Sequence, residues 1–311
     1  MAFSPPKPLY QGDKCHLSCR GLSNIPADVC KHFELRQLDL QHNNLQKLPS
    51  QLADLKLSNL DISSNKFKVL PPVICKLMKL RYLYSNSNQL KKLPMELKEL
   101  KLLEVLRLLG NEIDHFPPVI PLMTSLVELN LSGNSLHSIP KGISSLKRLT
   151  ELDLGYNKLD SLPDELCKLT NLKTLYVQGN NLASLPSEIN GLRKLRNLLL
   201  TDNKLRELPA SLVEVTSLRI VSVTNNHLEC FPELFFTKLK RLKTFNCEGN
   251  NLKHPPRRVV EGGLKELRKY DQQQAKGYMV ADNTTEVQLG EKRTRCDGDD
   301  ENVTTKYVKT K

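Results

Sequence analysis

The segment Leu126-Val-Glu-Leu-Asn-Leu-Ser-Gly-Asn134 decides the fold of this chain of 311 residues. Leu129 and Leu131 stand two positions apart, which is typical of a short strand with one buried face. The closing asparagine recurs every 22 to 24 residues, most often after 23. A fixed period of this length predicts stacked units, each of which buries its apolar residues only against its neighbours. The recurring residues are Asn43, Asn65, Asn88, Asn111, Asn134, Asn157, Asn180, Asn203, Asn226 and Asn250.

The residues after each asparagine follow a second pattern. An apolar residue comes two positions on, then a Leu-Pro pair such as Leu162-Pro163, and then apolar residues at steps of three. This change of period predicts a strand, a turn, and a short helical or extended return. A tight turn repeated at every level leaves buried backbone groups, and a short amide side chain can satisfy them. We therefore expect the ten asparagines to form a structural ladder.

The complete unit reads L-x-x-L-x-L-x-x-N-x-L-x-x-L-P-x-x-L-x-x-L, and it repeats ten times from about Leu35 to Pro256. This pattern resembles the leucine-rich repeat family in its intracellular subtype, and it is similar to the scribble-type and Ras-pathway scaffold members. The resemblance implies an α/β solenoid, a horseshoe with a parallel concave β-sheet and short helical or extended convex segments. It also implies a role in intracellular signalling.

The pattern divides the chain into five parts. Residues 1–14 are expected to be an unstructured N-terminal segment, and residues 15–34 a degenerate N-terminal capping repeat in which Cys19 takes an interior strand position. Residues 35–256 hold ten repeats of about 23 residues. Residues 257–274 have near-helical apolar spacing, which predicts a capping helix interrupted near Gly262. Residues 275–311 are polar and are expected to be a disordered tail.

Composition bounds the cellular context. The formal net charge is +12, and five of the eight cysteines align with apolar repeat positions, as free cysteines commonly do. Neither a secretory signal nor a run of 18 apolar residues is recognisable. We expect a cytoplasmic protein in a reducing compartment, without membrane insertion.

The strand register assigns side chains to the two faces of the sheet. In the unit that ends at Asn43, Leu38 and Leu40 point inward, so Gln37, Asp39 and Gln41 point outward. Ten strands at a spacing of about 4.8 Å make a concave face on the order of 45 Å across, which suits a protein partner. Aromatic, arginine and exposed apolar residues often dominate binding. The candidate partner-binding residues are Tyr82, Tyr84, Val105, Arg107, Leu109, Asp153, Tyr156 and Tyr176.

Two alternatives to partner binding stay open for these surfaces. Aromatic and β-branched residues also pack against neighbours on any sheet, so a single candidate residue can be structural. Basic residues such as Arg81, Lys173 and Arg196 form an edge where the strands begin, and a nucleic acid or an anionic membrane could bind there. Because the concave columns are acidic and would repel phosphates, we interpret this edge as solvated charge.

No catalytic, metal-binding or phosphate-binding constellation is recognisable, since the seven histidines are scattered over different units. We therefore expect a non-enzymatic protein-protein interaction module, a scaffold or regulator, with no cofactor and no metal. Its partner is expected to be a protein and not a nucleic acid, and the chain to be monomeric by itself. The alternatives are a regulatory subunit or substrate adaptor of an enzyme complex and, less favoured, an extracellular recognition domain.

Overall fold

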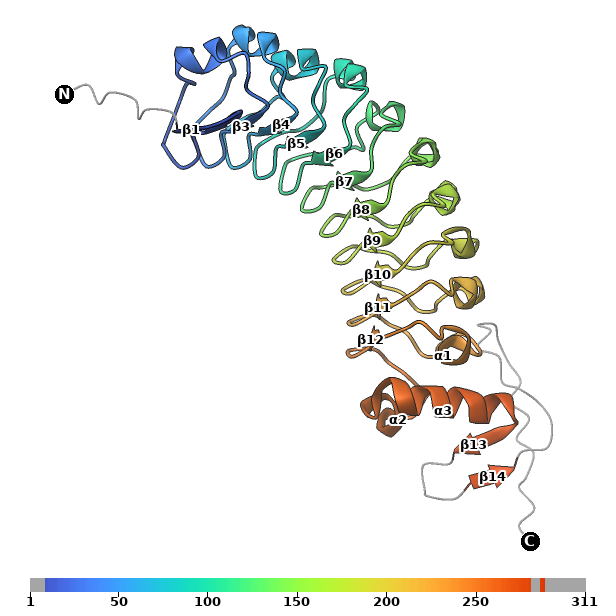
Figure 1. Cartoon of the computed structure of the whole chain (residues 1–311). Coiled ribbons are helices and arrows are strands. Elements are labelled where there is room, and N and C mark those ends of the chain that lie inside the picture. Colours follow the sequence, from blue (N-terminus) through green and yellow to red (C-terminus); the bar gives the residue numbers. More distant parts are fainter. Residues whose placement is uncertain (1–8, 281–285, 289–311) are drawn as a thin grey trace.

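The computed structural model describes residues 9–280 and 286–288. Successive repeats stack into a curved arc, with the strands on the inner concave side and short helices on the outer convex side (Figure 1). Neighbouring strands are parallel from β2 to β12 and follow the order of the sequence. The prediction of an α/β solenoid with a parallel concave sheet is confirmed.

Each strand of the solenoid sheet contains three residues, because the chain must turn twice within one repeat. The strands are β1 (Leu9–Gln11), β2 (Lys14–His16), β3 (Gln37–Asp39), β4 (Asn59–Asp61), β5 (Tyr82–Tyr84), β6 (Val105–Arg107), β7 (Glu128–Asn130), β8 (Glu151–Asp153), β9 (Thr174–Tyr176), β10 (Asn197–Leu199), β11 (Ile220–Ser222) and β12 (Thr244–Asn246).

The convex return of most repeats is a single turn of 3₁₀-helix. A proline precedes six of these helices at the N-cap, as Pro163 precedes η7, where its fixed φ and missing N–H cost nothing. They are η1 (Ala27–Lys31), η2 (Ser50–Asp54), η3 (Pro72–Lys76), η4 (Met95–Glu99), η5 (Ile120–Leu122), η6 (Lys141–Ser145), η7 (Asp164–Lys168), η8 (Ile189–Gly191) and η9 (Ala210–Glu214). The α-helices are α1 (Phe235–Lys238), α2 (Arg257–Glu261) and α3 (Gly263–Ala275).

Each ladder asparagine bonds to backbone groups of its own repeat and of the preceding repeat. The amide nitrogen of Asn134 donates to the carbonyl oxygens of Leu131 and Leu108, both at 3.0 Å. Its Oδ1 accepts from the backbone N–H of Ile113, also at 3.0 Å. Asn157 makes the same three contacts one level on, to Leu154, Leu131 and the N–H of Leu136. Nine of the ten asparagines are buried, and Asn250 in the last repeat is half-buried.

The residue before each ladder asparagine turns the chain with a positive φ. Glycine fills this position at Gly110, Gly133 and Gly179, where a left-handed conformation carries no steric cost. Other repeats place a side chain there, including Tyr156 with a φ of 53°. For a bulky residue this conformation costs roughly 1 kcal/mol.

The N-terminal segment departs from the prediction. Residues 1–8 lie outside the described residues, but residues 9–14 are not unstructured, because β1 and β2 form an antiparallel hairpin. Gly12 opens the two-residue turn with a φ of +60°. A Gly-Asp pair between two short alternating segments is a known hairpin signal, and it was overlooked. β1 covers the first edge of the sheet, which would otherwise offer unpaired backbone groups to other chains.

Within the N-terminal cap, the assignment of Cys19 to an interior strand position is wrong. Cys15 pairs in register with Leu38 and is 1% exposed, and Leu17 takes the next interior position. Cys19 is exposed and occupies the left-handed turn, with a φ of 57°. The cap contains fewer residues between the strand and η1 than a full repeat, so alignment from the proline backward shifts its strand by two residues.

The C-terminal cap covers the last repeat with α3. Leu267 is 2% exposed among the final apolar residues, and Arg268 donates to the carbonyl of Leu242 at 2.9 Å. Asp271 accepts from the backbone N–H of Thr237 at 2.8 Å, at the beginning of α1. These contacts close a stack that would otherwise expose its core.

The predicted tail is not wholly without structure. β13 (Tyr278–Val280) and β14 (Glu286–Gln288) pair as a separate antiparallel two-stranded sheet, so the expectation of disorder from residue 275 on is wrong there. Tyrosine and valine in these segments have a high strand propensity. Residues 281–285 and 289–311 lie outside the described residues.

Candidate functional site

The outward residue at the end of each strand forms what we call the middle row. Parallel register places Tyr84, Arg107, Asn130, Asp153 and Tyr176 side by side on β5 to β9. Each pair comes from positions 23 residues apart, so the solenoid converts a sequence period into a surface. Five of the eight candidate residues lie on these strands and are at least partly exposed: Tyr82, Tyr84, Arg107, Asp153 and Tyr176.

Arg107 links two kinds of side chain on this face. Its Nε donates to the carboxylate of Glu128 on the next strand, and its guanidinium carbon lies 5.5 Å from the centre of the Tyr84 ring. The hydrogen bond to Glu128 raises the pKa of Arg107 further above its usual range. Ion pairing and the aromatic face together hold the guanidinium in one place. Arg107 therefore presents a fixed cation beside an aromatic surface.

Carboxylates crowd the middle of the face. Glu128 and Glu151 stand directly opposite each other on β7 and β8, and Asp153 follows on β8. Burial, then the charges of Glu128 and Asp153, raise the pKa of Glu151 against the lowering effect of Arg107. Burial also raises the pKa of Asp153, although its hydrogen bonds oppose the shift. The outward positions of the ten repeat strands and the residues two beyond them carry six carboxylates and one cation, Arg107.

Some middle-row residues also hold the backbone, which the sequence analysis missed. Oδ1 of Asp61 accepts from the N–H of Ser63 at 2.8 Å, and Oδ1 of Asp153 accepts from the N–H of Gly155 at 3.0 Å. Asn130 also donates to Asp153 at 3.0 Å. Asp and Asn often bond the backbone two residues on, so their recurrence at this position was the available signal. Asp153 is thus a structural residue as well as a candidate contact.

Val105 is not an exposed contact residue, contrary to the prediction. It points outward from β6 but is only 9% exposed, because it lies between Tyr82 and Glu128 on the adjacent strands. Leu109 is 42% exposed in the loop that follows β6. The alternative of sheet packing therefore applies to Val105.

The structure brings Tyr156 to the rim of the concave face and not into the rows on the strands. It follows β8 and is 61% exposed. Its ring covers the next repeat, since a Cβ at Gly179 would lie 2.6 Å from Cδ1 of Tyr156. Tyr176 lies inside the face, where burial, then Glu151 and Asp153, raise its pKa. The two tyrosines flank the carboxylate of Asp153 from the rim and from the neighbouring strand.

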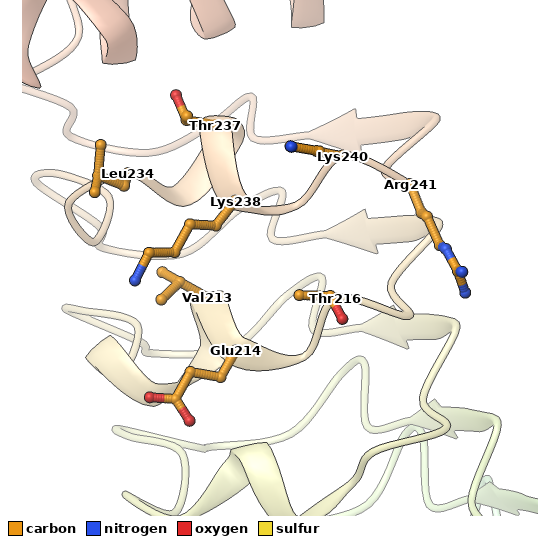
Figure 2. Close-up of a pocket in the computed structure, with 8 residues that line it drawn as sticks. All are labelled: Val213, Glu214, Thr216, Leu234, Thr237, Lys238, Lys240 and Arg241. Atoms are coloured by element: carbon orange, nitrogen blue, oxygen red, sulfur yellow. The ribbon is translucent and has the colours of Figure 1, made fainter.

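A hollow of about 790 Å³ lies outside the concave face, between η9 and α1 on the convex side (Figure 2). Its lining comes from two consecutive repeats and contains no convergent catalytic set. The lining residues are Val213, Glu214, Thr216, Leu234, Thr237, Lys238, Lys240 and Arg241.

Metal and membrane-spanning features were sought over residues 9–280 and 286–288. No group of three or more His, Cys, Asp or Glu side chains in those ranges is arranged to hold a metal ion. Among the same residues, no helix combines the length and the apolar character needed to cross a bilayer.

Comparison with known proteins supports the repeat assignment. A family model described as leucine-rich repeat region matches residues 73–179, and the leucine rich repeat model matches residues 34–55, 56–77 and 171–192. A leucine-rich repeat protein of Leptospira interrogans shares 31% identity with a TM-score of 0.70, covering 81% of this chain and 70% of that one. No curated protein matches the chain.

Two plant structures show the same fold over larger proteins. The peptide hormone receptor RGFR1, solved in complex with RGF2, shares 32% identity with a TM-score of 0.66 over 76% of this chain. The Arabidopsis receptor kinase HAESA, solved with the peptide hormone IDA and the co-receptor SERK1, shares 26% with a TM-score of 0.63 over 77%. The chain spans only 40% and 46% of these two structures. On the repeat models and the Leptospira relative together, this chain belongs to the leucine-rich repeat family.

Proposed function

We propose that the chain is a non-enzymatic module that binds a protein partner on its concave sheet and acts as a scaffold or regulator in signalling. The observation that carries the proposal is the row across β5 to β9, where Tyr84, Arg107 and Glu128 are held together beside Asp153 and Tyr176. Fixed aromatic and arginine side chains lose little entropy on binding and are enriched among residues that dominate binding energy.

The face suits a protein and not a phosphate polymer. Its six carboxylates against one arginine would repel nucleic acid, whereas a protein segment can offer complementary cations and apolar side chains. The family's coarse role as an interaction module agrees with this assignment, and the two plant receptors are proteins whose structures contain bound peptides. The identity of the partner is not implied by the fold.

A cytoplasmic location is part of the proposal. The six described free cysteines support a reducing compartment. Cys230 opposes it, because it is disulfide-bonded. Mass spectrometry of the native protein after thiol alkylation decides this point: a fully alkylated Cys230 supports the cytoplasm, and a retained disulfide supports an oxidising compartment.

The test of the concave face uses partner capture with the full chain. Tyr84→Ala with Tyr176→Ala should remove the bound partner by at least about ten-fold, the loss typical of two hot-spot aromatics. Thr244→Ala with Asn246→Ala on β12 changes the same number of outward residues and should leave capture unchanged. Circular dichroism must show the same unfolding temperature for both variants. Equal capture by the wild type and the tyrosine variant would exclude this face.

A further inference from the structure

The loops that lead into the strands form a second surface on one side of the arc. Parallel strands keep the same direction throughout β2 to β12, so all of these entry loops lie on the same side. We define an entry loop as the six residues before each strand from β3 to β12. The five C-terminal entry loops are residues 145–150, 168–173, 191–196, 214–219 and 238–243.

These five loops concentrate the positive charge of the chain. They carry twelve basic residues and one acidic residue, a net charge of +11. The five N-terminal entry loops, residues 31–36, 53–58, 76–81, 99–104 and 122–127, carry seven basic and four acidic residues, a net charge of +3. The twelve are Lys147, Arg148, Lys168, Lys173, Arg193, Lys194, Arg196, Arg219, Lys238, Lys240, Arg241 and Lys243, and all of them are exposed.

The C-terminal cations are not neutralised by neighbours. No ion pair in the described part of the chain includes any of the twelve. Lys194 donates instead to the neutral amide oxygen of Asn171 at 2.8 Å. In the N-terminal loops, Arg81 pairs with Glu104 at 2.9 Å. Like charges repel when they are crowded on adjacent loops, so an anionic surface would stabilise this arrangement.

The N-terminal part of the same side is apolar. Met78, Leu102 and Leu122 lie in three consecutive entry loops and are 54%, 40% and 50% exposed. These loops lie directly before the first basic loop in the stack. A polynucleotide offers its phosphates to the cations but nothing that would cover this apolar stretch. A bilayer surface offers both anionic headgroups and an apolar boundary below them.

We propose that the entry-loop side of the solenoid binds the surface of an anionic lipid bilayer. The side chains of the five basic loops contact headgroups, and Met78, Leu102 and Leu122 rest on the interface. Lys238, Lys240 and Arg241 also line the convex hollow with the hydroxyl of Thr216, where a headgroup phosphate can enter (Figure 2). Because the concave face is adjacent and remains uncovered, the chain can hold a protein partner while it lies on the membrane.

Vesicle co-sedimentation with the full chain tests the proposal. The wild type should bind vesicles of phosphatidylcholine with about 30% phosphatidylserine and not vesicles of phosphatidylcholine alone. Each basic residue near an anionic bilayer contributes on the order of a five-fold factor to partitioning. A variant with Arg193→Gln, Lys194→Gln, Lys240→Gln and Arg241→Gln should therefore bind at least about thirty-fold more weakly.

A matched variant on the opposite side controls for net charge. Lys66, Lys92, Lys158 and Lys204 are exposed and follow the strands instead of preceding them. Their change to glutamine removes the same four charges and should weaken binding by less than about three-fold, because these residues face away from the bilayer.

Two results would overturn the proposal. One is equal weakening by the two variants, or no binding of the wild type to the anionic vesicles, since charge placement then has no role. The other is tighter binding of a single-stranded RNA of about 20 nucleotides than of the vesicles, lost in the entry-loop variant, which would assign the side to nucleic acid. The test does not involve the concave partner, so the proposed function stands or falls separately.

Discussion

Two rows of side chains begin in the same short strands and differ in how far they vary. The ladder row is asparagine in all ten repeats, whereas the middle row includes Asp, Tyr, Arg, Asn, Leu and Ser. Asn134 contacts backbone groups that recur at every level, so one side chain fits every repeat. Middle-row residues contact solvent and each other, so each repeat is free to differ. Constancy in this molecule marks the framework, and variation marks the surface available for binding.

The largest expected effect is the loss of a ladder residue. Asn134→Ala leaves the N–H of Ile113 and the carbonyls of Leu108 and Leu131 without this partner inside the core. Each buried group left unpaired costs about 1–3 kcal/mol, so we expect a loss of about 3 kcal/mol or more in the free energy of unfolding. Urea unfolding measures it. Asn197→Ala makes the same change on the outward face and should cost less than about 0.5 kcal/mol. Similar losses for the two variants would remove the distinction between the rows.

A residue that occurs once should behave like the framework when it closes the stack. Asp271→Ala removes the acceptor of the Thr237 N–H and should cost about 1–2 kcal/mol. Glu266→Ala on the same helix removes only an exposed pair with Lys269 and should cost less than about 0.5 kcal/mol. Thermal unfolding of both variants gives the comparison. A cost for Asp271→Ala no greater than that of the control would show that α3 closes the stack through its apolar contacts alone.

Charge on the concave face should lower stability slightly. Like charges directly opposite each other on neighbouring strands are unfavourable by a few tenths of a kcal/mol or more, so Glu151→Gln should stabilise the chain by about 0.5 kcal/mol at neutral pH. The pKa of Glu151 is raised on folding, which means that the folded state binds the proton more tightly. Acidification from neutral pH through the folded pKa therefore stabilises the wild type, and the advantage of the variant should disappear there.

Unfolding curves at several pH values measure this difference between Glu151→Gln and the wild type. Asp160→Asn provides an exposed control away from the face and should show no such change. If Glu151→Gln is destabilising at neutral pH, the carboxylate has a structural role and belongs with the framework.

The smallest expected change in stability is at Tyr156. Tyr156→Gly relieves a left-handed strain of roughly 1 kcal/mol but loses the ring contact with Gly179 and frees the unfolded chain. These effects nearly cancel, so the free energy of unfolding should change by less than about 0.5 kcal/mol. Partner affinity should still fall about ten-fold, since an exposed ring at the rim is lost. Unchanged affinity would show that the ring serves only to cover the next repeat.

Sequence reasoning located the strands and the inward residues closely, because both follow from a local period. It placed Tyr84, Arg107 and Tyr176 on one outward face before any coordinates were available. It misjudged Val105, whose exposure depends on Tyr82 and Glu128, each 23 residues away. It missed the first hairpin, because it treated Gly12-Asp13 as part of a featureless segment. It also shifted Cys19, since the shortened cap does not keep the repeat period.

The sequence by itself determined the solenoid, the ladder of asparagines and the division between buried and outward positions. Those properties depend on neighbours within one repeat, and the period states them directly. Only the tertiary structure decided which outward residues are exposed, that Arg107 is held between Tyr84 and Glu128, and that twelve basic residues share one side of the arc without ion pairs. The physical reason is that these contacts join different repeats, and their geometry is set when the repeats stack.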